Sequence, residues 1–245
     1  MSTYDSTTYG DHWASLYDLI ESPSLDTEGA VECLSELSGN GTLLELGVGT
    51  GRVALPLVER GFTVHGIEAS SAMIEELQKR PGAEELTIIK GDFADIAATT
   101  SYSLIFAAYN TFSSLLEQET QIQCLKSAAR SLTPSGALVL ELAVPDLARL
   151  AKEQDVSVRF VDSELVVLHA AQYDLLNQKI VGQTTVTTNG LTRIFPVQVR
   201  YIWPSELDLM ARIAGLKLES RWADWQKSEF KGSSTSHISV YRLLD

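Results

Sequence analysis

The chain has 245 residues, 44% of them hydrophobic, and a net charge of −13 at pH 7. This length and composition predict one large α/β domain, or a domain with an insertion, built around a full hydrophobic core. The acidic charge argues against a nucleic-acid partner. No apolar run approaches the ~18 residues of a membrane helix. The two cysteines lie outside any metal-ligand pattern, which favours a reduced cytoplasmic setting and no bound metal.

Residues 1–25 form a polar lead segment that is rich in aromatic side chains. Helical spacing places Tyr9, Trp13 and Tyr17 on one face of a helix. Two interpretations stay open at this point: the rings pack on the core, or the segment is a lid over a ligand site. His12 is a candidate base in this segment, while a surface position is the ordinary one for a histidine.

Residues 26–145 are expected to hold the ligand-binding core, which starts with a helix over residues 26–37. A strand at 43–46 leads into a loop with glycines at 47, 49 and 51, and a helix follows. Glycine accepts positive φ and lets a ligand approach the backbone. The helix start offers unpaired N–H groups to an anion or carboxylate. A dinucleotide fingerprint would place glycine at position 52, where this chain has Arg52.

Three further parallel strands follow in the predicted core. The second strand ends at Glu68, and the third ends in Gly91-Asp92-Phe93. The fourth strand covers residues 102–110. Its carboxyl end, residues 109–114, is expected to face the switch point of a doubly wound sheet, where ligands bind. A helix at 117–132, a turn at 133–136 and a fifth strand at 137–142 complete this region.

Residues 146–203 depart from a minimal doubly wound fold. Val-, Thr- and Ile-rich segments at 164–176, 179–188 and 191–203 predict about three antiparallel strands, and Asn189-Gly190 is a strong hairpin signal. These strands can be a flap over the site or a dimerisation sheet, and the two functions are compatible. Residues 204–245 are expected to return to the core as a helix at 204–215 and a closing hairpin at 216–225 and 237–243.

The glycine-rich loop, Glu68 and Gly91-Asp92-Phe93, in this order and spacing, resemble the class I methyltransferases that use S-adenosyl-L-methionine (SAM). The resemblance implies a doubly wound, seven-stranded, Rossmann-like α/β sheet with an antiparallel final strand and an inserted antiparallel β flap. It also implies that Glu68 accepts the ribose hydroxyls, that Asp92 accepts the adenine amino group and that the product is S-adenosyl-L-homocysteine. The cofactor-binding residues that it implies are Tyr9, Tyr17, Glu45, Gly47, Gly49, Gly51, Arg52, Glu68, Ala69, Met73, Gly91, Asp92, Phe93, Ala107 and Phe112.

The expected function is methyl transfer from SAM to a small-molecule or peptide acceptor. Tyr109, Asn110, Tyr17 and His12 are the candidates to orient or activate that acceptor. Amine methylation is favoured because a hydroxyl would call for a base, and His12, His169 and His237 offer no single clear choice. O-methylation is the alternative. An oxidoreductase with a nucleotide cofactor and a non-catalytic cofactor-binding module are more distant ones.

The flap and the segment Trp203-Pro204-Ser205-Glu206-Leu207 resemble methyltransferases of natural-product pathways. Two subgroups are considered: sugar-amine N,N-dimethyltransferases and α-N-methyltransferases of linaridin-type peptides. The sugar enzymes carry a histidine a few residues past the fourth strand, where this chain has Ser114. That difference weakens the sugar-amine assignment, whereas Asn110-Thr111-Phe112 and the helix at 207–216 resemble the peptide subgroup more closely. The assembly is expected to be a monomer or a homodimer through the inserted strands.

Overall fold

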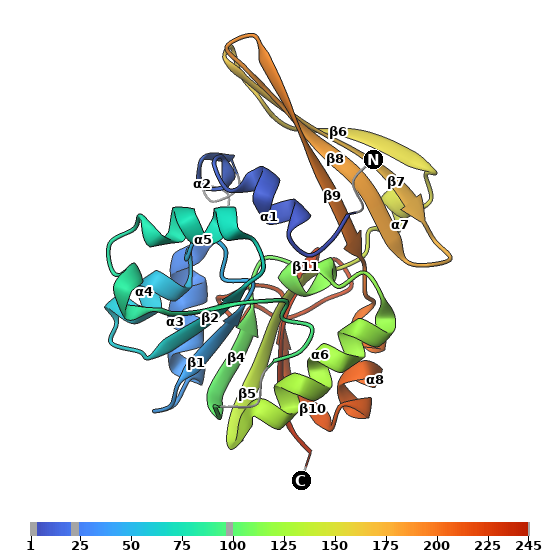
Figure 1. Cartoon of the computed structure of the whole chain (residues 1–245). Coiled ribbons are helices and arrows are strands. Elements are labelled where there is room, and N and C mark those ends of the chain that lie inside the picture. The colour runs from blue at the N-terminus through green and yellow to red at the C-terminus, as the bar shows by residue number, and fades with distance from the viewer. Residues whose placement is uncertain (1–3, 21–24, 97–99, 245) are drawn as a thin grey trace.

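The structure is a computed structural model that describes residues 4–20, 25–96 and 100–244. These residues form a seven-stranded sheet covered by helices and a separate four-stranded sheet that projects beyond one end of it (Figure 1). Residues 1–3 and 21–24 of the predicted lead segment lie outside the described part of the chain.

The larger sheet has the topology predicted for a doubly wound methyltransferase core. Strands β1 to β5 pair in parallel, whereas the last strand, β11, is antiparallel to both of its neighbours, β5 and β10. The predicted fold class, including the antiparallel final strand, is confirmed. In spatial order the strands are β10 (Leu216–Trp222), β11 (Ser236–Leu243), β5 (Leu132–Ala143), β4 (Tyr102–Ala107), β1 (Leu43–Leu46), β2 (Val64–Glu68) and β3 (Thr87–Lys90).

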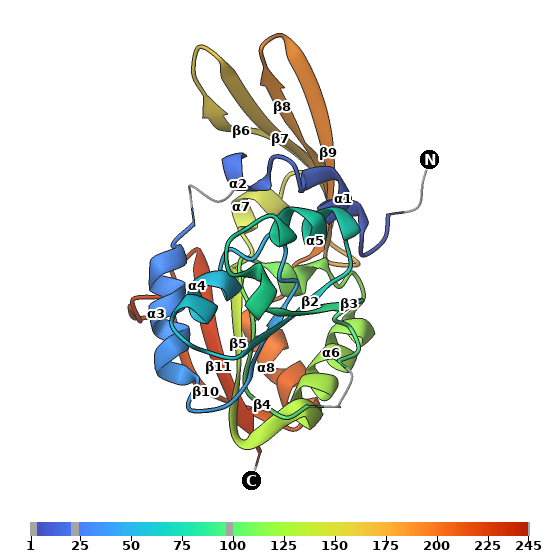
Figure 2. The same ribbon diagram turned by 60° about the vertical axis from the view of Figure 1, so that its left-hand side comes forward.

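Helices cover both faces of this sheet and create two hydrophobic cores (Figure 2). One core includes Leu125 and Leu207, and the other includes Leu34 and Leu57. All four residues of the central strand β1 are buried, because a parallel strand between two helical layers meets no solvent. The helices around the sheet are α3 (Thr27–Leu37), α4 (Ala54–Glu59), α5 (Ser71–Gln78), α6 (Gln118–Ser131) and α8 (Pro204–Ile213), with short 3₁₀ turns η2 (Ala83–Glu85) and η3 (Thr111–Ser114).

The strand β5 differs from its prediction at its start. Residues 133–136, which were expected as a turn before the strand, belong to β5. The parallel pairing with β4 passes from Tyr102↔Leu132 to Leu104↔Ala137, so residues 133–136 form an irregularity within the strand. The Pro-Ser-Gly sequence therefore interrupts the ladder without ending the strand.

The smaller sheet contains four antiparallel strands, so the prediction of about three strands is wrong in number. They are β6 (Gln154–Val161), β7 (Leu165–Asp174), β8 (Lys179–Thr188) and β9 (Leu191–Arg200), preceded by the short helix α7 (Leu147–Leu150). The additional strand, β6, pairs only with β7 and carries charged residues beside its alternating apolar ones. Asn189 and Gly190, both with positive φ, form the predicted tight turn between β8 and β9. We call this four-stranded sheet the flap.

The lead segment lies between the core and the flap as α1 (Thr8–Trp13) and α2 (Tyr17–Ile20) (Figure 1). The indole of Trp13 stacks on Phe195 of β9, with 4.4 Å between ring centroids. Toward the core, the hydroxyl of Ser70, which precedes α5, donates a hydrogen bond to the carboxylate of Asp11 in α1 over 2.6 Å. A side chain at Gly10 would collide with Ser70, which explains the glycine at this close approach. No helix in the described ranges is long and apolar enough to cross a membrane.

A buried histidine in β11 makes a pH-dependent contribution to stability. His237 is fully buried, and its Nδ1 lies 2.8 Å from the Ser239 hydroxyl. Burial, reinforced by the nearby Arg221 charge, lowers the pKa of His237 from 6.5 to about 4. The folded state therefore keeps this imidazole neutral at pH values where the unfolded chain binds a proton.

We predict that this difference in the pKa of His237 between the folded and unfolded states lowers the free energy of unfolding by about 2 kcal/mol as the pH falls from 7 to 5. The reason is that only the unfolded state gains the proton over this range. The contribution is fully present above pH 6.5 and is lost progressively down to about pH 4. Urea unfolding of the wild type and of His237→Gln at pH 7 and pH 5 measures it. The variant should lose less stability between the two pH values, whereas His12→Gln, at an exposed position, should behave as the wild type does. Equal losses in the wild type and His237→Gln would contradict the assignment.

Candidate active site

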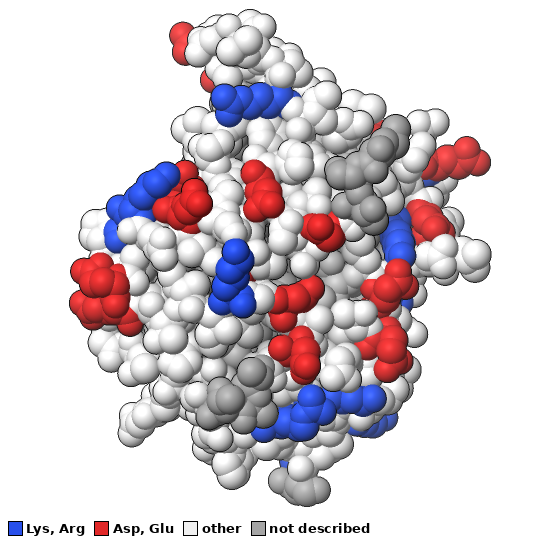
Figure 3. All heavy atoms as spheres, in the orientation of Figure 1, with Lys and Arg blue, Asp and Glu red and all other residues white. Residues whose placement is uncertain are grey.

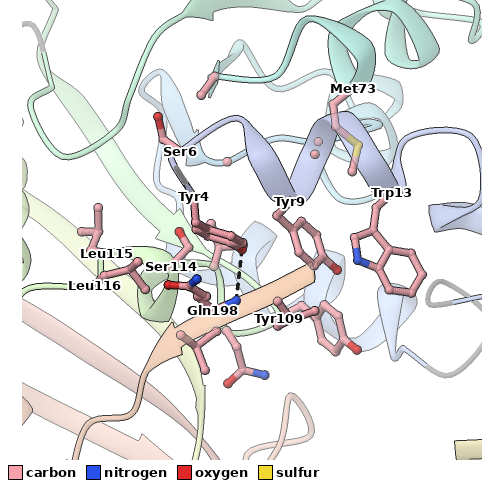
Figure 4. Close-up of a pocket in the computed structure, with 18 of the residues that line it drawn as sticks. Tyr4, Ser6, Tyr9, Trp13, Met73, Tyr109, Ser114, Leu115, Leu116 and Gln198 are labelled. Atoms are coloured by element: carbon pink, nitrogen blue, oxygen red, sulfur yellow. Dashed lines mark hydrogen bonds between the residues drawn. The ribbon is translucent and has the colours of Figure 1, made fainter. Parts of the chain in front are cut away.

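A cavity of about 380 Å³ lies at the carboxyl ends of the central strands, under the lead segment and beside the flap (Figure 4). Its volume is within the range of small-molecule sites. The loops after β1, β2, β3 and β4 supply one wall, and α1, β7, β8 and β9 supply the other. This position is the switch point that doubly wound sheets use for ligands.

The loop after β1 approaches the cavity with its backbone exposed. Gly47 and Gly49 adopt φ values of +68° and +55°, which side chains with a Cβ rarely tolerate. A Cβ at Gly47 would lie 2.4 Å from the methyl group of Thr111, whereas a Cβ at Gly49 would meet nothing within 4 Å. Since Gly49 also lines the cavity, that open space is ligand space.

Glu68, at the end of β2, ties this loop to the neighbouring strand. Its Oε2 accepts a hydrogen bond from the Gly49 amide and its Oε1 accepts one from the Ser70 amide, each over 2.9 Å. Burial raises the pKa of Glu68, although these amide donors oppose the rise. A carboxylate offers about four acceptor positions, so Glu68 keeps capacity for hydroxyl groups of a ligand.

The remaining residues of this half of the cavity come from the ends of β2 and β3 and from α5. Asp92 follows β3 and accepts the Ala94 amide over 2.9 Å. Met73 is buried on α5 and lines the cavity. The structure thus brings together these predicted cofactor residues: Tyr9, Tyr17, Gly47, Gly49, Glu68, Ala69, Met73, Asp92 and Phe93.

Six predicted cofactor residues do not line the cavity. Glu45 is buried on β1, where burial raises its pKa to about 8, and its Oε2 has no hydrogen-bond partner among the described residues. Arg52 turns toward α3 and donates to the Thr27 hydroxyl over 2.8 Å. The other four lie in the supporting backbone or the core beneath the site: Gly51, Gly91, Ala107 and Phe112.

The second half of the cavity starts at the end of β4. Tyr109 and Asn110, both predicted as acceptor-orienting residues, line it. Tyr17 reaches the same cavity from α2. His12, in contrast, is exposed on α1, with its Nδ1 2.7 Å from the Thr8 carbonyl oxygen, and does not line the cavity.

Several cavity residues were not predicted. Tyr4 accepts the Gln198 amide of β9 over 3.1 Å, and Arg159 of β6 lies 3.4 Å from the Tyr109 hydroxyl. Thr184 is buried on β8 with its hydroxyl 3.2 Å from His169 Nδ1. Tyr4 belongs to the aromatic lead segment, whereas the position of the flap residues against the cavity depends on contacts between distant parts of the chain, which no local sequence pattern encodes.

Comparisons with known proteins agree with this geometry. A family model described as a methyltransferase domain matches residues 43–136. The cypemycin N-terminal methyltransferase of a Streptomyces species is 30% identical over 218 residues, which cover 87% of this chain and 89% of that protein. The structure of the CcbJ methyltransferase from Streptomyces caelestis superposes with a TM-score of 0.94 at 38% identity, over 99% of this chain and all of the other. The glycopeptide N-methyltransferase MtfA in complex with SAM shares the fold, with a TM-score of 0.62 at 15% identity over 89% and 94% of the two chains.

The fold and the site define a methyltransferase with a Rossmann-like core. The chain belongs to the class I SAM-dependent methyltransferases, and SAM is its cofactor. This membership removes the oxidoreductase and the non-catalytic module that the sequence had left open.

The residues of the first half of the cavity fit this cofactor. The carboxylate of Glu68 is buried beside the Gly49 amide, next to space that a Cβ at Gly49 would enter. A buried carboxylate with spare acceptor capacity suits the vicinal hydroxyls of a ribose. Asp92, Phe93 and Met73 line the same half of the cavity. The Asp92 carboxylate can accept a hydrogen bond from an adenine ring, and Phe93 and Met73 offer apolar surfaces for that ring.

We predict that Glu68→Ala weakens SAM binding about ten- to a hundredfold, since hydrogen bonds to a charged group contribute about 1.5–3 kcal/mol. Isothermal calorimetry with SAM measures the dissociation constant. Glu76→Ala, on α5 and away from the cavity, is the matched control and should bind as the wild type does. Unchanged affinity in Glu68→Ala would show that this carboxylate neither binds the ribose nor is needed to hold the cofactor loop.

Proposed function

We propose that the protein transfers the SAM methyl group to an amine nitrogen of a small molecule or peptide held in the second half of the cavity. The observation that carries this proposal is the aromatic lining of that half. Rings from the lead segment and from the end of β4 line it: Tyr4, Tyr9, Trp13 and Tyr109 (Figure 4). Tyr17 lines the same cavity. Aromatic faces attract a cationic amine, and phenol oxygens accept hydrogen bonds from an N–H group.

Methylation of an amine does not require a strong catalytic base in this site. The α-amino group of a peptide has a pKa of roughly 7.7–8.0, so a useful fraction is already unprotonated near neutral pH. When bound, SAM supplies an electrophilic sulfonium methyl group. The protein's task is then to align the acceptor lone pair with that group and to exclude water. We assign the alignment to Tyr109, Asn110 and Tyr17 and the exclusion of water to the ring pair Trp13–Phe195.

A peptide amine is our preferred acceptor within this class. The cypemycin N-terminal methyltransferase supports it, because its name places the methylated position at an N-terminus. Ser114 lines the cavity at the position where sugar-amine enzymes are expected to carry a histidine. This serine cannot act as the base that a histidine would supply.

The distribution of charge supports a small molecule or a peptide over nucleic acid. On the face shown in Figure 3, lysine and arginine side chains are interspersed with aspartate and glutamate. A net charge of −13 repels a phosphate backbone.

Methylation of a hydroxyl is the second candidate, and one observation favours it. His169 of β7 lines the cavity, with its Nδ1 3.2 Å from the Thr184 hydroxyl. A histidine is the side chain best suited to take a hydroxyl proton near neutral pH. His169 therefore separates the two candidates experimentally.

We predict that Tyr109→Phe lowers turnover roughly three- to tenfold and leaves SAM affinity within a few-fold, because the phenol contributes a hydrogen bond to the acceptor and not to the cofactor. The assay uses a peptide with a free N-terminal alanine, its N-acetylated form and glucosamine, with products detected by mass spectrometry. Tyr201→Phe, which lies off the cavity, is the control.

In the same assay His169→Gln should retain most of its turnover on an amine. Loss of turnover in His169→Gln together with methylation of a glucosamine hydroxyl would support the O-methylation candidate instead. Wild-type turnover in Tyr109→Phe would place the acceptor elsewhere.

A further inference from the structure

The end of β4 has an unusual backbone conformation. Tyr109 and Asn110 are consecutive non-glycine residues with φ values of +48° and +60°. Side chains with a Cβ disfavour this region, and such strain persists only where surrounding contacts enforce it. These two residues also line the cavity, so the strained corner lies where the acceptor is proposed to bind.

The contacts that enforce this corner come from the end of the neighbouring strand β5. The Tyr109 amide donates to Glu141 Oε2 over 2.6 Å. The Asn110 amide donates to the main-chain oxygen of the same glutamate over 3.1 Å, and the Asn110 side-chain oxygen accepts the Ala143 amide over 2.5 Å. Glu141 therefore holds both strained residues, one with its side chain and one with its backbone.

Two residues that do not line the cavity, Trp225 and Arg52, interact with the Glu141 carboxylate. Trp225 donates a hydrogen bond to it, and burial raises its pKa. Arg52 adds a favourable charge interaction, which gives this arginine of the glycine-rich segment a role away from the cavity. A carboxylate held in this way is a rigid acceptor for the Tyr109 amide.

The corner also connects the two halves of the cavity. On one side, the Tyr109 hydroxyl lies in the second half, 3.4 Å from Arg159 of the flap. On the other side, Thr111 directly follows the corner and its methyl group occupies the space beside Gly47 of the cofactor loop. A shift of this corner would move the tyrosine relative to the cofactor loop.

We propose that Glu141 is a positioning residue for methyl transfer: by accepting the Tyr109 amide it holds the left-handed corner that aims the Tyr109 hydroxyl at the acceptor. This inference rests on the proposed function, in which Tyr109 orients the acceptor. Glu141 acts through Tyr109 and touches neither substrate.

The first test compares three substitutions at this one position. Glu141→Gln keeps an oxygen that can accept the Tyr109 amide and should turn over within about threefold of the wild type, whereas Glu141→Leu removes the acceptor and should lower kcat about tenfold or more, since small misplacements of aligning groups are costly. Glu141→Asp keeps the charge on a shorter side chain and should resemble Glu141→Leu. The acceptor is the free-amine alanine peptide, and SAM affinity should stay within a few-fold throughout.

A double-mutant cycle with Tyr109→Phe shows whether Glu141 acts through the tyrosine. The double variant Glu141→Leu/Tyr109→Phe should be no slower than the slower single variant. The reason is that each change removes the same contribution, the orientation of the acceptor by the Tyr109 hydroxyl. Multiplicative losses, or equal turnover in Glu141→Gln and Glu141→Leu, would overturn the proposal. Wild-type turnover in Tyr109→Phe alone would instead contradict the proposed acceptor site, so the two failures are distinguishable.

A crystal structure gives a readout that needs no acceptor. In Glu141→Leu, or in Glu141→Asp if the leucine variant does not fold, bound to the SAM analogue sinefungin, Tyr109 should leave positive φ and its hydroxyl should leave the cavity. In Glu141→Gln both should stay in place. An unchanged corner in the leucine or aspartate variant would overturn the proposal.

Discussion

The site depends on the hydrogen bond between the Gly49 amide and the Glu68 carboxylate. Parallel pairing of β1 with β2 sets the ends of these strands side by side, with Leu46 opposite Ile67. The glycine-rich loop and the acidic strand end therefore face one another, and the hydrogen bond fixes their separation at 2.9 Å. The backbone of the loop is then open to the cofactor, and a carboxylate is held beside it.

A second set of polar contacts holds the flap beside the second half of the cavity, where we propose that the acceptor binds. Arg200, buried at the end of β9, donates to Gln121 of α6, to Gln178 of the turn before β8 and to Glu206 of α8. A buried guanidinium with all three partners in place resists rotation of the flap against the core. The cavity wall formed by β7, β8 and β9 thus keeps a defined position relative to the end of β4.

The cofactor half could be predicted from the sequence because it follows from local order. A loop after the first strand, an acid at the end of the second and Gly-Asp-Phe after the third meet at one sheet edge in any doubly wound fold. The same rule located Tyr109 and Asn110 at the end of β4. It could not tell which side chains turn away from the cavity: Glu45 and Arg52 lie in the motif but pack beneath it.

The acceptor half depends on contacts between distant parts of the chain. Tyr4 meets Gln198 of β9, and Arg159 meets Tyr109 from β6, a strand that is distant from Tyr109 in the sequence. The role that we propose for Glu141 depends on the backbone conformation at Tyr109, which a sequence pattern does not reveal.

A crystal structure of the wild type with S-adenosyl-L-homocysteine would show directly which half of the cavity holds the cofactor. We expect the ribose hydroxyls on Glu68, the adenine beside Asp92 and the sulfur directed toward Tyr109 and the aromatic half of the cavity. A ribose away from Glu68, or a sulfur directed away from the end of β4, would contradict it.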